Sequence, residues 1–121
     1  MAGDRDCFVH EASLTVASDF DDRGPGGAVT VALCGALEHD PPCPLAPHQT
    51  STTVSGTRAV VRVVFACLAA DEPLVRERIE SAMALGEFRH ESGVTSWTLV
   101  ATNRARLDAE ELVLGKRLAA T

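Results

Sequence analysis

The sequence lacks the features that mark nucleic-acid-binding and membrane proteins. Its 121 residues include 17 acidic side chains and only 11 Lys or Arg, which gives a formal net charge of −6. No basic excess is therefore present to neutralise phosphates or an anionic membrane surface. No apolar run approaches the ~20 residues of a membrane-spanning helix, and the polar start lacks the basic and apolar regions of a signal peptide. We expect a cytoplasmic protein with no nucleic-acid and no membrane partner.

The four cysteines of the chain allow several roles. They are Cys7, Cys34, Cys43 and Cys67. In a reducing compartment such thiols are core residues, reactive groups or metal ligands, whereas an oxidising compartment would allow three disulfide pairings. A disulfide between Cys34 and Cys43 stays open as an alternative. A chain of this length buries a core without needing such crosslinks.

Hydrophobic periodicity predicts four strands and two helices. Alternation of apolar and polar residues predicts strands over 8–18, 28–38, 57–69 and 94–102, with a possible short edge strand over 49–55. In the last of the four, Trp97, Leu99 and Ala101 are expected on one face. Helical spacing predicts helices over 71–85 and 108–118, with Arg76 on the outer side of the first. Asp108 with Glu111 three residues later forms a predicted capping box for the second helix.

This pattern predicts the fold class α+β. We expect a disordered tail over 1–6 and a single domain over 7–121. Its antiparallel sheet of about four strands would carry two helices on one face, in the order β-β-β-α-β-α. The alternation resembles ferredoxin-like α+β sandwiches, many of which dimerise through an open sheet face. The order of elements departs from theirs, so the resemblance implies fold class alone. Small residues of the 28–38 segment, from Ala28 to Ala36, predict a homodimer through that sheet face.

The richest chemistry lies in the proline-rich stretch 34–48. Its spacing is Cys34-x4-His39-x3-Cys43-x4-His48. Two thiolates and two imidazoles form the ligand set of a tetrahedral zinc site, and they also suit copper. Prolines stiffen the connecting chain, so that less entropy is lost when it wraps an ion. His10, on the neighbouring predicted strand, is a candidate extra ligand. The sequence therefore predicts a small metal-binding protein with a structural, sensing or carrier role.

Other functions use the same residues. The stretch lacks the Cys-x2–4-Cys knuckle of most zinc sites, so Cys34 could instead be a core residue and His39 and His48 solvated loop side chains. A metal-free dimeric module would bind a small-molecule ligand through the open sheet face. Cys43 could also bind haem through its thiolate, or act as the nucleophile of a thiol-dependent enzyme. Cys67 and Trp97 are expected in the core.

Overall fold

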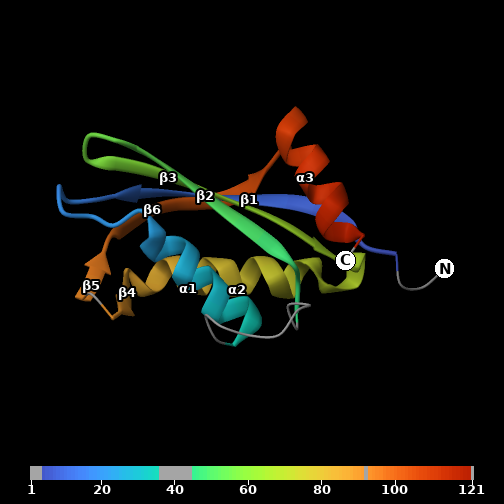
Figure 1. The fold of residues 1–121 in the computed structure, drawn as a ribbon, viewed down its shortest axis with the longest axis horizontal. Helices are drawn as coiled ribbons and strands as arrows, with labels where there is room; N and C mark the ends of the chain where they lie inside the picture. The colour runs from blue at the N-terminus through green and yellow to red at the C-terminus, as the bar shows by residue number, and fades with distance from the viewer. Residues whose placement is uncertain (1–3, 36–44, 92, 121) are drawn as a thin grey trace.

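The computed structural model describes residues 4–35, 45–91 and 93–120. These ranges contain six strands, three α-helices and one short 3₁₀ turn (Figure 1). In chain order they are β1 (Asp6–Thr15), α1 (Arg23–Cys34), β2 (His48–Ser55), β3 (Arg58–Cys67), η1 (Ala69–Asp71), α2 (Glu72–Leu85), β4 (Glu87–His90), β5 (Gly93–Ser96), β6 (Thr98–Ala105) and α3 (Ala109–Ala119). No helix in the described ranges is long and apolar enough to cross a lipid bilayer.

Four strands form one antiparallel sheet in the order β2-β3-β1-β6, while β4 and β5 pair as a separate hairpin. Helices α1 and α2 lie against one face of the sheet, and α3 lies against the other (Figure 1). The predicted α+β class is confirmed. Without the hairpin and α3, the succession β1-α1-β2-β3-α2-β6 is the β-α-β-β-α-β order of ferredoxin-like sandwiches. The order therefore differs from the predicted β-β-β-α-β-α.

The difference arises mainly in the segment expected as a strand over 28–38. Residues 28–34 belong to α1, which starts at Arg23 with Pro25 in its first turn and ends at Cys34. Gly35 follows with a φ of 83°, which closes the helix in the left-handed region, and 36–38 lie outside the described residues. Its buried residues recur at helical spacing: Gly24, Pro25, Ala28, Val29, Leu33 and Cys34. Of the small residues predicted as a dimerising sheet face, those from Ala28 to Cys34 thus lie on a helix, and Ala36 lies outside the described residues. Ala28 and Ala32 line a shallow groove between α1 and α2, and homodimerisation stays a prediction.

Glycines near the start of α1 permit close packing of the β4–β5 hairpin. A Cβ on Gly24 would lie 2.1 Å from Cγ2 of Thr95, and one on Gly27 would lie 2.6 Å from the ring of Phe88. Neither distance is compatible with an ordinary side chain, so this contact requires glycine. The start of α1 is therefore tightly packed against the hairpin.

The predicted strand over 94–102 is divided at Trp97 into β5 and β6. A β-bulge lies in the pairing of β1 with β6: Ser13 is opposite Ala101, whereas Leu14 is opposite Leu99. Val100 is the additional residue, and its side chain is largely exposed. The bulge places Leu99 and Ala101 on opposite faces, so their predicted common face is wrong.

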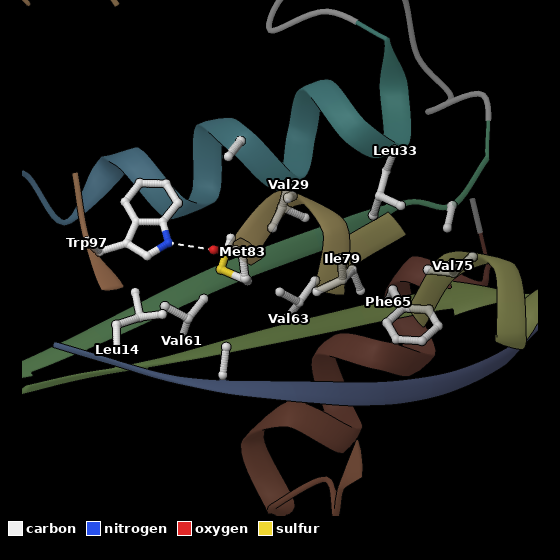
Figure 2. Packing of buried hydrophobic residues seen from close by; sticks show 14 of the residues in the cluster. Leu14, Val29, Leu33, Val61, Val63, Phe65, Val75, Ile79, Met83 and Trp97 are labelled. Atoms are coloured by element: carbon white, nitrogen blue, oxygen red, sulfur yellow. Dashed lines mark hydrogen bonds between the residues drawn. The ribbon is translucent and has the colours of Figure 1, made fainter. Parts of the chain in front are cut away.

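The core lies between the sheet and the α1–α2 layer (Figure 2). Strand residues Leu14, Val61, Val63 and Phe65 face the helix residues Val29, Leu33, Val75, Ile79 and Met83. Trp97 closes one end, where its indole Nε1 donates to the carbonyl of Met83 at 2.8 Å. Trp97 and Cys67 are both buried, as expected. These contacts fix α2 against the sheet, and α2 supplies most of the candidate site.

Helix α3 covers part of the opposite face, so the expected placement of both predicted helices on one face is wrong. The predicted capping box is present: Asp108 accepts from the Glu111 amide, and the Glu111 side chain accepts from the Asp108 amide. Glu111 also pairs with Arg62 of β3 at 2.7 Å. Gly115 lies so close to the sheet that a Cβ there would be 2.6 Å from Cβ of Cys7. The close approach at Gly115 and the ion pair between Glu111 and Arg62 therefore hold α3 on the sheet.

Candidate functional site

The candidate site is built around two polar side chains that are almost fully buried. His10 is on the core-facing side of β1 and is 2% exposed, and Arg76 is on the sheet-facing side of α2 and is 7% exposed. Among the described residues, only Thr95 joins them as a buried polar side chain. Because burying a charge is costly unless it is paired, Arg76 requires charged and hydrogen-bonding partners.

Arg76 has such a set of partners. Its Nη1 donates to the carbonyl of Val9 at 3.0 Å and to Nδ1 of His10 at 2.9 Å. Its Nε donates to Glu72 at 2.7 Å, one turn earlier on α2. The guanidinium carbon lies 5.7 Å and 5.3 Å from the ring centroids of Phe8 and Phe65, within cation–π range. The expected position of Arg76 on the outer side of its helix is wrong.

These contacts fix the tautomer and charge of His10. A guanidinium only donates, so Nδ1 accepts and Nε2 carries the proton. The Nε2–H group donates to Oγ1 of Thr102 at 2.7 Å and lies 3.3 Å from the carboxylate of Glu80. Burial, and then the Arg76 charge, lower the pKa of His10, while Glu80 opposes this change. His10 is therefore neutral near pH 7, and both of its ring nitrogens have partners.

A pocket of about 360 Å³ opens beside this pair, between α2 and the edge strand β6. His10 and Arg76 form part of its lining, with Glu77 and Glu80 from α2 and Arg104 from β6. Arg104 is directly opposite His10 in the strand register and lies 3.7 Å from Glu72. Its side chain is 70% exposed and that of Glu80 is 45% exposed. Charged groups of both signs are thus available to a molecule entering from solvent.

The predicted metal ligands are only partly within the described residues. His39 and Cys43 lie outside them. Cys34, at the end of α1, and His48, at the start of β2, come together, with Sγ 3.9 Å from Nδ1. Cys34 is disulfide-bonded, and His48 also contacts Thr30 and the carbonyl of Ala46. In the described ranges no three His, Cys, Asp or Glu side chains are grouped as a metal site would require.

The candidate extra ligand His10 is separated from His48 by β3 in the sheet, and its nitrogens are used elsewhere. The proposed nucleophile Cys43 lies outside the described residues. Burial, with nearby Asp71 and Glu72, raises the pKa of Cys67 to about 11, so this thiol is not activated. The pocket is therefore a place where two buried polar side chains and accessible charged groups meet.

The sequence contained a partial signal for this site. His10 is on the apolar parity of its strand, which marks a buried polar residue without naming its partner. Arg76 follows the buried Val75 and precedes the buried Ile79 by three positions, so it is on the margin of the apolar face. No family model, curated protein or solved structure matches the chain.

Proposed function

We propose that the protein is a ligand-binding module that holds a small polar molecule in the pocket between α2 and β6. The observation that carries the proposal is the location of the buried pair: His10 and Arg76 both line this one pocket. Ligand sites combine enclosed surface with a few fixed polar groups. Here the contacts of Arg76 to Val9, His10 and Glu72 hold those groups in place before any ligand arrives.

The hydrogen bonding favours binding over acid–base catalysis. A general base needs a free nitrogen within reach of the proton that it removes. Nδ1 of His10 is occupied by Arg76, and Nε2 carries a proton that is directed at Thr102. The lowered pKa of His10 also disfavours a protonated, proton-donating imidazole near neutral pH. We therefore assign His10 to the support of the pocket and the polar groups around it to recognition.

The test is a protein-observed NMR titration with a panel of amino acids, small carboxylates, primary amines and monosaccharides. We expect at least one class to shift the amides of residues 76–80 and 102–104 saturably. Glu77→Trp, which places an indole at a pocket-lining position, should abolish those shifts. Arg78→Trp is the matched control, because Arg78 is the next residue of α2 and lines a different groove. If no class binds, or if binding maps elsewhere, the proposal is wrong.

Metal binding is a second candidate function, supported by the 3.9 Å approach of Cys34 to His48. Because a thiolate is the ligand, an ion would bind only after the disulfide of Cys34 is reduced. We expect stoichiometric zinc or copper in reduced, tag-free protein, and its loss in His48→Ala. His90→Ala, on β4, is the matched control. Elemental analysis that finds no metal in the reduced wild type would reject this function.

A further inference from the structure

Apart from Arg76, which is paired with Glu72, the charges that line the pocket are divided between its two walls. The carboxylates of Glu77 and Glu80 come from α2, and the guanidinium of Arg104 comes from β6. Glu80 directs one oxygen, Oε2, toward His10 and Thr102. Its other oxygen is engaged in no hydrogen bond or ion pair within the described part of the chain. A ligand would therefore meet negative groups on one side and a positive group on the other.

The other charges of the site largely neutralise one another. Arg76 is paired with Glu72 at 2.7 Å, and Arg104 reaches the same carboxylate only at 3.7 Å. At that distance the Arg104 guanidinium, which is 70% exposed, keeps donors available for an anionic group. Because His10 is neutral, the pocket and its margin hold two arginines and three glutamates, Glu72, Glu77 and Glu80. A ligand carrying an anion alone would meet an excess of negative charge.

We propose that the pocket takes a free amino acid, with its ammonium group on Glu77 and Glu80 and its carboxylate on Arg104. This inference rests on the proposed ligand-binding function and names the chemical class of the ligand. A zwitterion pairs with the carboxylates of one wall and the guanidinium of the other at once, whereas a lone amine or a lone carboxylate pairs with the groups of only one wall. The excess carboxylate also predicts an order among amino acids: lysine binds more tightly than alanine, and glutamate binds least.

The experiment compares four probes by NMR or calorimetry: L-lysine, L-alanine, propylamine and propionate. Arg104→Gln should weaken alanine binding about tenfold, the loss expected for one charge-assisted hydrogen bond, and should leave propylamine unaffected. Glu80→Gln keeps an acceptor for Thr102 and His10 but removes the charge, and it should weaken alanine, lysine and propylamine. Arg89→Gln and Glu87→Gln remove like charges from exposed positions of β4 and are the matched controls.

The outcomes separate this inference from the proposed function. The amino-acid assignment would be overturned by tight binding of propionate that depends on Arg104, or by an affinity for propylamine equal to that for alanine. In either case a ligand-binding pocket would remain. Binding of a monosaccharide alone would do the same. If neither these four probes nor the wider panel bind, both the inference and the proposed function fail. Because Arg104 and Glu80 are substantially exposed, both variants should fold, which the dispersion of their amide spectra checks.

Discussion

Substituting Arg76 with leucine tests whether the buried guanidinium holds α2 on the sheet. In the wild type it donates to Val9, His10 and Glu72 at 2.7–3.0 Å. Leucine fills a similar apolar volume between Phe8 and Phe65 but donates nothing. Three acceptors, one of them a carboxylate, would then face an aliphatic side chain. The change therefore isolates the polar contribution of Arg76 from its packing.

The magnitude follows from the surroundings of Glu72. Removing one partner of a buried ion pair costs about 3–5 kcal/mol, because the remaining charge is left uncompensated. Glu72 keeps a weaker partner in Arg104 at 3.7 Å, and its side chain is 17% exposed. We therefore expect a loss at the low end, about 3 kcal/mol. With a urea dependence of about 1–3 kcal/mol per molar, the unfolding midpoint should fall by about 1–3 M.

The assay is urea unfolding followed by the fluorescence of Trp97, the only tryptophan in the chain and a buried one. Arg78→Leu, on the same helix, is the control: its one hydrogen bond, to Ala32, is 3.4 Å long, and its loss should cost less than about 0.5 kcal/mol. Adding Glu72→Gln to Arg76→Leu should recover stability by removing the unpaired charge. If Arg76→Leu costs no more than Arg78→Leu, the reasoning is refuted.

Three further predictions concern single groups. Because burial holds the pKa of His10 below 6.5, on acidification the unfolded chain binds a proton that the folded chain does not. The free energy of unfolding should therefore fall as the pH is lowered from about 7 to about 5, and an equal fall in His10→Gln would contradict this. Cys67, with its pKa near 11, should resist iodoacetamide at about pH 8 in folded protein by mass spectrometry; alkylation as fast as in urea would argue otherwise. Gly115→Ala should lower the melting temperature by several degrees, because overpacking against Cys7 costs about 1–3 kcal/mol. Adding Cys7→Gly should partly restore the melting temperature, and an unchanged melting temperature in Gly115→Ala would count against the contact.

The elements that the sequence predicted correctly are those whose local signals agree with their tertiary environment. The segment 57–69 is the most apolar part of the chain, with Ala59, Val61, Val63, Phe65 and Cys67 on one parity, and it contains the central strand β3, whose residues on that parity are all buried. The capping box at Asp108 is a purely local device, and it is present. Helix α1 was missed because valines at 29 and 31 favour a strand, whereas packing of its helical face on the sheet and α2 prevails.

The candidate site was less accessible to prediction, because it depends on contacts between distant segments. His10 and Arg76 are 66 positions apart, and nothing local pairs them. Arg76 and Glu80 have the i,i+4 spacing that is typical of surface ion pairs on a helix, but Glu80 lies 3.3 Å from His10 instead. The pocket also depends on the register of β6, which places Arg104 opposite His10. Such register depends on a bulge that the alternation of residues does not reveal.

The bulge leaves the edge strand β6 with one residue, Val100, that has no partner in the pairing with β1. If Val100 were deleted, Leu99 would still be opposite Leu14, and Arg104 would still be opposite His10, because the register on the two sides would join without a step. The strand can therefore tolerate shortening by one residue without turning any side chain to the wrong face. A version of this chain shortened by one residue at Val100 would keep both the core contact of Leu99 at one end of β6 and the charged pocket at the other.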